Sequence, residues 1–106
     1  MWLYTVKIWS ATVPNPYVAH TGSFENVEER QEARFCRSKS PNDGLRLLLE
    51  MSAAFKNGPR KGSRRYIVEY KVISMVQIPD DTDPTLLAEL SVHELSAEAV
   101  TQAYLD

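Results

Sequence analysis

The sequence has very few of the residues from which catalytic and metal sites are most often built. Its 106 residues include one cysteine and two histidines. These three residues lie in separate segments, without the paired spacing of a zinc site or the neighbours that activate a nucleophile; they are His20, Cys36 and His93. We therefore predict no catalytic residue, no bound metal and no cofactor. We interpret Cys36 as a small buried hydrophobic residue, because free cysteine is commonly buried in this way.

The scarcity of cysteine and the lack of long apolar runs bear on the location of the protein. A single cysteine cannot form an internal disulfide, which is typical of proteins from a reducing cytoplasm. No segment approaches the roughly 18 consecutive apolar residues of a membrane-spanning helix. The N-terminal residues also lack the basic region and unbroken apolar run of a signal peptide. These absences predict a soluble cytoplasmic protein without a membrane partner.

Glycine is scarce as well, and the arrangement of two glycines excludes a familiar nucleotide site. Gly58 and Gly62 enclose Pro-Arg-Lys. A phosphate-binding loop needs a longer spacing between its glycines, follows a strand and opens a helix. Here the surrounding patterns predict the reverse order, a helix before the loop and a strand after it. Nucleotide hydrolysis is therefore not predicted.

What remains is an ordinary globular composition, with 43% hydrophobic and 25% charged residues. A chain of this length can bury one hydrophobic core without metals or disulfides. We find no internal repeat, no low-complexity tract and no linker. The sequence predicts a single compact domain over residues 1–106.

The strongest secondary-structure pattern is a long apolar segment at residues 64–79. Residues 66–72 alternate between apolar and polar, which is the period of a strand with one solvated face. From 72 to 78 the alternation fades, so both faces are predicted to contact protein, and Pro79 ends the strand. We interpret this segment as the central strand of a small sheet and expect almost full burial of three of its residues: Val72, Ile73 and Val76.

Three further segments are candidates for strands. Residues 2–10 alternate and are rich in aromatic and β-branched residues, which predicts a strand. A short strand at 17–21 would pair with it in the antiparallel direction. Residues 25–38 are ambiguous, since Asn26 and Glu29 have the spacing of a helical capping box, whereas the residues that follow alternate. We prefer a strand from about 31 to 38 and keep a helix as the alternative.

A helix is predicted after Ser40, which is a suitable N-cap before Pro41 at the first helical position. Gly58 and Pro59 are expected to end it. Its apolar face is predicted to consist of Leu45, Leu48, Leu49, Ser52 and Phe55, widened by Leu47, Met51 and Ala54.

Start signals for short C-terminal helices occur at 80–84, at 91–94 and at Ser96. Together these patterns predict an α+β fold: a small antiparallel sheet of three to four strands, with one main helix packed on one face and short C-terminal helices.

Charge is unevenly distributed along the chain, although the net charge is only −2. No basic residue follows Lys71. Residues 30–71 carry eleven positive and four negative charges, a net of +7, whereas residues 72–106 carry −7. Such asymmetry indicates partners or self-association rather than a fold.

The densest group of positive charges lies around the loop between the main helix and the long strand. It consists of Lys56, Arg60, Lys61, Arg64 and Arg65. These side chains could bind phosphates of a nucleic acid or a partner protein, and a nearby strand could extend the patch through Arg30, Arg34, Arg37 and Lys39. The competing interpretation is a solvated turn, or one that pairs with the acidic tail of the same chain.

An acidic group follows the long strand and gives a second candidate surface. Asp80, Asp81 and Asp83 lack the glycine and the closing glutamate of a calcium loop, so we interpret them mainly as helix-capping residues. With Glu94 they form a predicted acidic partner surface.

The absence of catalytic motifs together with the uneven charge favours a non-enzymatic interaction protein. We expect a small regulator or inhibitor that binds a larger protein or nucleoprotein partner, as accessory proteins of phages and mobile elements often do. The alternative is a nucleic-acid-binding protein that uses the basic loop at 56–65. A homodimer is a further expectation, because the opposite charges of residues 30–71 and 72–106 could attract a second copy and because residues 30–38 are predicted to form a sheet edge.

Overall fold

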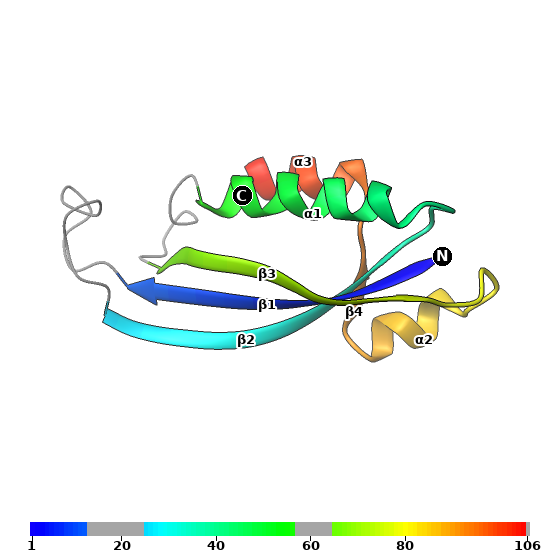
Figure 1. Ribbon diagram of the computed structural model, residues 1–106, viewed down its shortest axis with the longest axis horizontal. Helices are drawn as coiled ribbons and strands as arrows, with labels where there is room; N and C mark the ends of the chain where they lie inside the picture. Colours follow the sequence, from blue (N-terminus) through cyan, green and yellow to red (C-terminus); the bar gives the residue numbers. More distant parts are fainter. Residues whose placement is uncertain (13–24, 57–64, 106) are drawn as a thin grey trace.

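The computed structural model describes residues 1–12, 25–56 and 65–105. The elements follow the order β1 (Trp2–Thr12), β2 (Glu25–Cys36), α1 (Pro41–Lys56), β3 (Arg65–Gln77), α2 (Pro84–Glu89), β4 (Val92–Glu94) and α3 (Ala97–Leu105). The predicted α+β fold with one main helix and short C-terminal helices is confirmed (Figure 1). The strand predicted at 17–21 lies outside the described residues.

The sheet has the strand order β3-β1-β2-β4. Both β2 and β3 pair with β1 in the antiparallel direction. The short strand β4 pairs with β2 in the parallel direction, where Val92–Glu94 lie opposite residues 33–35. The sheet is therefore mixed: the predicted antiparallel pairing holds for β1, β2 and β3, whereas the short β4 is parallel to β2.

The central position belongs to β1, not to β3. Four side chains of β1 are completely buried, namely Tyr4, Val6, Ile8 and Ala11. The prediction that the long apolar strand is central and fully buried is wrong, since β3 lies at the edge of the sheet. Val72 is half-buried, and Ile73 and Val76 expose 44% and 51% of their surface. Apolar character predicts apolar surroundings, but it does not identify which strand has neighbours on both sides.

The helices α1 and α3 cover one face of the sheet, and α1 lies along β3 (Figure 1). Ser40 Oγ accepts a hydrogen bond from the Asn42 N–H at 3.3 Å, which confirms the predicted start of α1. The predicted helical face needs one correction, because Leu49 is 73% exposed. The buried face of α1 runs instead through Gly44, Leu47, Leu48, Met51 and Ser52.

α1 packs closely on β1 at Gly44. A methyl group at this position would overlap the phenol ring of Tyr4. The Tyr4 hydroxyl also donates a hydrogen bond of 2.6 Å to the carbonyl of Pro41. The side chain of Tyr4 therefore fills the space beneath the first turns of α1 and fixes the start of the helix against β1.

The second strand is longer than predicted and excludes the helical alternative for residues 25–36. β2 starts at Glu25, about six residues before the predicted boundary. Its charged residues find partners across the sheet, as Lys7 and Glu29 show with a contact of 2.8 Å. Pairing with β1 therefore outweighs the helix-forming tendency of this charged segment.

The opposite face of the sheet is covered at one end by α2 (Figure 1). A second apolar cluster lies there and consists of Met1, Phe35, Leu87 and Val92. Asp83 caps α2 by accepting a hydrogen bond from the Thr85 N–H at 2.9 Å, as predicted.

The helix start predicted at 91–94 is wrong, because residues 92–94 form β4. Ser91 has a φ of 61° and ends α2, and the chain then extends along β2. Ser96 does cap α3, since its Oγ accepts the Ala99 N–H at 3.2 Å. In the described part of the chain, no helix has the length and apolar character needed to cross a membrane.

Candidate functional site

The outer edge of β3 is the most conspicuous surface that the described residues leave unpaired. It runs for 13 residues, and no strand in the described residues pairs with it. Met1 and Ile78 exchange two backbone hydrogen bonds, of 3.1 and 2.9 Å. Since such pairs alternate along an antiparallel ladder, the backbone N–H and C=O groups of Met75 and Gln77 point away from β1. These groups are free to pair with a further strand.

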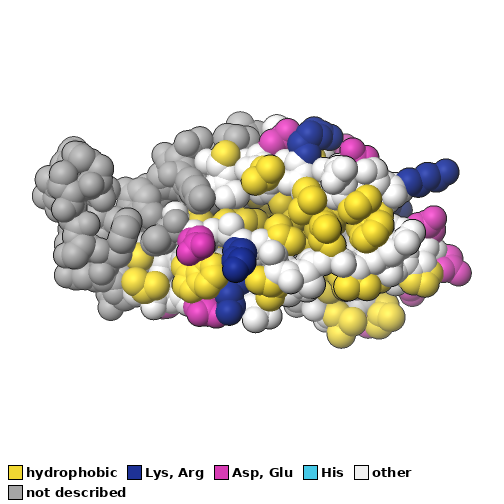
Figure 2. All heavy atoms as spheres, viewed as in Figure 1, with side chains coloured by type: hydrophobic (Ala, Val, Ile, Leu, Met, Phe, Trp, Pro, Cys, Tyr) yellow, Lys and Arg dark blue, Asp and Glu magenta, His cyan; other side chains and the backbone are white. Residues whose placement is uncertain are grey.

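The side chains along this edge are unusually apolar for a surface. Residues 72–78 carry no charge. Ile73 and Met75 expose 44% and 43% of their surface, and Leu49 on the adjoining helix α1 exposes 73%. Figure 2 shows hydrophobic side chains gathered where α1 lies over β3. A contiguous apolar patch of this kind is typical of an interaction surface. We call the outer backbone edge of β3 with the exposed side chains of residues 69–76 the β3 edge.

Two irregularities shape the β3 edge. The pairing of β3 with β1 shifts by one residue at Ile73 and again at position 68. Such bulges increase the local twist and are one means by which proteins prevent indiscriminate pairing of edge strands. The regular segment between them, residues 69–72, contains Glu69 and Lys71. The β3 edge thus combines a short regular stretch of opposite charges with flanking apolar residues.

The uncovered part of the opposite sheet face is occupied by contacts within the chain. Lys7 forms an ion pair with Glu29 at 2.8 Å and lies over the ring of Trp9, 5.6 Å from its centroid. The indole N–H of Trp9 donates to Glu29 at 3.2 Å. The hydrogen bond from Lys7 lowers the pKa of the Glu29 carboxyl. These groups satisfy one another, which is consistent with a structural role.

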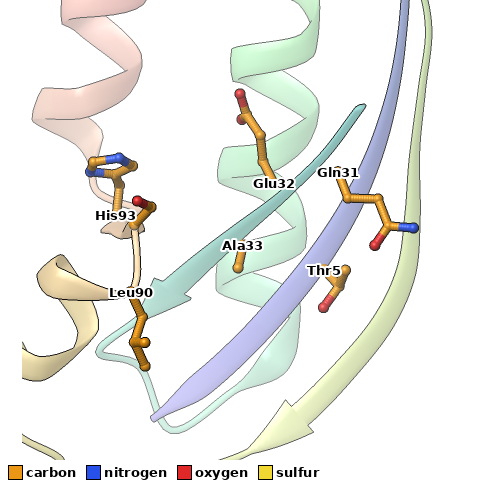
Figure 3. A pocket seen from close by; sticks show the side chains of 7 residues that line it. Thr5, Gln31, Glu32, Ala33, Leu90 and His93 are labelled. Atoms are coloured by element: carbon orange, nitrogen blue, oxygen red, sulfur yellow. The ribbon is translucent and has the colours of Figure 1, made fainter. Parts of the chain in front are cut away.

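A cavity of about 400 Å³ lies where the end of α2 and β4 meets β2 (Figure 3). The side chains of Thr5 and Ala33 point to its side of the sheet, and Leu90 lies across from them. The titratable residues among those that line it, Glu32 and His93, direct their side chains toward the opposite face of the sheet. The cavity therefore has no acid or base positioned over it for catalysis.

A polar cluster lies on the helix-covered face. Glu32 pairs with Arg30 and Arg34, each at 3.2 Å. Burial raises the pKa of the nearby Tyr70 hydroxyl to about 12, with a smaller contribution from the Glu32 charge. Among the described residues, the Tyr70 hydroxyl and the Arg34 Nε are buried without a hydrogen-bond partner. A neutral phenol beside paired charges is not an activated catalytic group.

Cys36 lies in the main core, as predicted, with 5% of its surface exposed. Burial raises the pKa of its thiol, so the reactive thiolate is disfavoured. Within the described ranges, no group of three or more His, Cys, Asp or Glu side chains is placed to hold a metal ion.

The predicted basic loop can be placed only in part. Lys56 ends α1 and Arg65 begins β3, whereas Arg60, Lys61 and Arg64 lie outside the described residues. The predicted extension of the patch does not form with Arg37 and Lys39, because they lie near the start of α1, at the opposite end of the sheet (Figure 1).

The arginines of the predicted extension are also engaged in ion pairs. Arg30 and Arg34 bind Glu32, and Arg37 binds Glu94 at 3.1 Å. These charges are partly neutralised within the chain, which weakens their attraction for phosphates.

The predicted acidic surface is used mostly for internal contacts. Asp80 forms an ion pair with the N-terminal ammonium group, and this hydrogen bond lowers the pKa of its carboxyl. Asp83 caps α2, Glu94 binds Arg37, and Asp81 is exposed. Most of the charged residues predicted from the sequence as an acidic partner surface thus form ion pairs or a helix cap within the chain. Sequence reasoning did not identify the β3 edge, although the uncharged run at 72–78 was the available signal.

Comparison of the chain with protein-family models, with curated protein sequences and with solved structures finds no match in any of the three. The candidate site therefore depends on the geometry described above.

Proposed function

We propose that this chain is a non-enzymatic interaction protein, a regulator or inhibitor, that binds a protein partner by strand addition to the β3 edge. The observation that carries the proposal is an edge strand of 13 residues whose uncharged half exposes Ile73, Met75 and Val76. Uncharged runs of this kind are typical of strands whose two faces both contact protein, and the side chains of an added strand would lie beside these exposed residues. A partner strand would provide the missing neighbour.

The energetics favour such a partner. Each backbone hydrogen bond between strands contributes about 0.5–1.5 kcal/mol net, because the free groups already bind water. Burial of apolar surface adds about 25 cal/mol per Å². Strand addition therefore derives affinity from the backbone and specificity from the side chains beside it. At the β3 edge, the backbone N–H and C=O groups of Met75 and Gln77 point outward, and the side chain of Ile73 is exposed. These features support affinity and specificity, respectively.

Photo-crosslinking from this edge tests the proposal. We would replace Ile73 in the full chain by a photo-reactive residue (Ile73→benzoylphenylalanine), irradiate host cells and identify the joined peptides by mass spectrometry. A matched control would carry the same residue at Glu98, which is exposed on α3. The proposal predicts products from position 73 and none from position 98.

A proline variant shows whether those products depend on backbone pairing. Met75→Pro removes an outward N–H and leaves the hydrogen bonds to β1 in place, and edge strands tolerate proline at such positions. The products from position 73 should disappear in this variant. If position 73 gives no product, or gives a product that survives Met75→Pro, strand addition at β3 is wrong. A product formed with nucleic acid would instead support the alternative of nucleic-acid binding.

A further inference from the structure

We infer that the strand added to the β3 edge is the β3 strand of a second copy of this chain. The two strands run antiparallel about a two-fold axis at Tyr70. This inference rests on the proposed function and identifies the partner. It follows from the order of charges along β3, from the direction of the outward backbone groups and from the symmetry of the contact.

The order of charges selects one register. A two-fold axis at Tyr70 places Glu69 of each copy opposite Lys71 of the other. A shift of the axis by one residue places Glu69 opposite Glu69, or Lys71 opposite Lys71. Like charges that are directly opposite destabilise a strand pair. With the axis at Tyr70, two pairs of opposite charge form, one on each side of the axis, and each joins Glu69 of one copy to Lys71 of the other.

The apolar residues agree with the same register. Ile73, which is 44% exposed in the single chain, comes to lie opposite Ile67 of the second copy. Beyond it, Met75 lies opposite the first residue of the partner strand, Arg65. Pairs of β-branched residues across strands contribute to sheet stability, so the exposed Ile73 gains a suitable neighbour.

The backbone groups point in the required direction. In the pairing of β1 with β2, residues 2–10 of β1 show no irregularity, so the alternation that starts at Met1 continues through Ile8. Ile8 directs its N–H and C=O toward β2, and its partner Tyr70 therefore directs its own away from β1. Tyr70 and its symmetry mate can exchange two hydrogen bonds at the axis.

Symmetry explains why the contact closes at two copies. The two chains use the same edge, and the two β3 edges pair with each other. No β3 edge therefore remains available for a third copy. A two-fold axis perpendicular to the sheet places both α1 helices side by side on one face. The exposed Leu49 of α1 then belongs to the same assembly face as the strand contact.

Charge reversals test this register directly. The single variants Glu69→Lys and Lys71→Glu each place like charges opposite one another at two positions. We expect each reversal to raise the dissociation constant of the dimer by roughly tenfold or more. The double variant Glu69→Lys/Lys71→Glu should restore the dimer. An equimolar mixture of the two single variants should restore it as a heterodimer, because every opposite pair is then again of unlike charge.

Sedimentation equilibrium at low salt gives the readout. The wild-type protein should sediment at twice the chain mass of 12.0 kDa. Glu89→Lys, a reversal at an exposed position on α2, serves as the matched control and should leave the dimer unchanged. Thermal melts of each variant check that the fold is retained.

The outcomes separate this inference from the function on which it rests. Three results would each contradict the β3–β3 dimer. The protein could be a monomer at all concentrations, the single charge reversals could leave the dimer unchanged, or the mixture of the two single variants could fail to restore dimerisation. If products from position 73 then contain a different protein, strand addition at β3 stands and only the second copy is excluded. If position 73 gives no product with any chain, both proposals fail.

Discussion

The strands β1 and β3 have similar sequences and very different surroundings. Both are long, rich in aromatic and β-branched residues, and free of proline within the strand. β1 has neighbours on both sides and buries Tyr4, Val6 and Ile8 completely, whereas β3 has one neighbour among the described residues and exposes Ile73 and Val76. The apolar content of a strand therefore indicates that its side chains favour contact with protein. Only the strand order shows whether the same chain supplies the neighbouring strands.

The largest expected effect compares the two strands directly. Ile8→Ala removes a completely buried side chain and should lower the free energy of unfolding by about 2–5 kcal/mol. Ile73→Ala, measured at concentrations where the chain is a monomer, should cost well under about 1 kcal/mol because its side chain is already partly solvated. Urea denaturation of both variants makes the comparison. Equal losses would show that β3 is as central as β1.

The next effect concerns the contact that holds α1 over β1. Alanine is favoured over glycine within a helix by about 1 kcal/mol. Gly44→Ala should nevertheless destabilise the protein by about 1–3 kcal/mol, because the new methyl group overlaps the Tyr4 ring. Thermal unfolding measures the sign of the change. A stabilised Gly44→Ala variant would mean that α1 does not pack this closely on β1.

On β3, the inner face can be tested separately from the outer edge. Tyr70→Phe removes a buried hydroxyl that lacks a partner among the described residues, and should raise the free energy of unfolding by about 1 kcal/mol. The folded-state pKa of Tyr70 is raised from 10.0 to about 12. The ionisation of Tyr70 therefore leaves stability unchanged below pH 10 and lowers it as the pH rises from 10 toward 12.

Urea denaturation at about pH 8 and about pH 11 measures this dependence. The wild type should lose more stability than Tyr70→Phe over this interval. Identical losses in the two proteins would show that Tyr70 is not the group responsible.

The smallest expected effect concerns the ion pair between Lys7 of β1 and Glu29 of β2, on the sheet face opposite α1 and α3. The pKa of Glu29 is lowered from 4.5 in the folded state by its hydrogen bond from Lys7. Its contribution is present above pH 4.5 and is lost as the pH falls below that value. Glu29→Gln should reduce stability slightly at neutral pH and show a shallower loss on acidification. Parallel acid curves for wild type and variant would exclude this role.

Local signals predicted several elements correctly. Ser40 and Pro41 marked the start of α1, and Asp83 marked that of α2. The burial of Cys36 also followed from its residue type. These features depend on chemistry within a few residues, which a sequence displays directly.

Non-local pairing could not be predicted in the same way. The strand order places β3 at the edge, and nothing within its own residues specifies that position. The segment 91–94 has the spacing of a capping box, yet pairing with residues 33–35 makes it a strand. The expected edge at 30–38 is right only in part, because β4 covers residues 33–35 of β2. The candidate site was missed for the same reason, since the β3 edge exists only because of the strand order.

The central claim is that a partner strand occupies the β3 edge. Its most direct test is amide hydrogen exchange measured as a function of protein concentration. The outward amides of Tyr70 and Met75 should exchange quickly in dilute solution and become protected as the concentration rises. The Tyr4 amide, which lies between β1 and β2, should remain protected throughout and serves as the internal reference. Exchange at Tyr70 and Met75 that is fast at every concentration, with and without cell extract, would contradict the account.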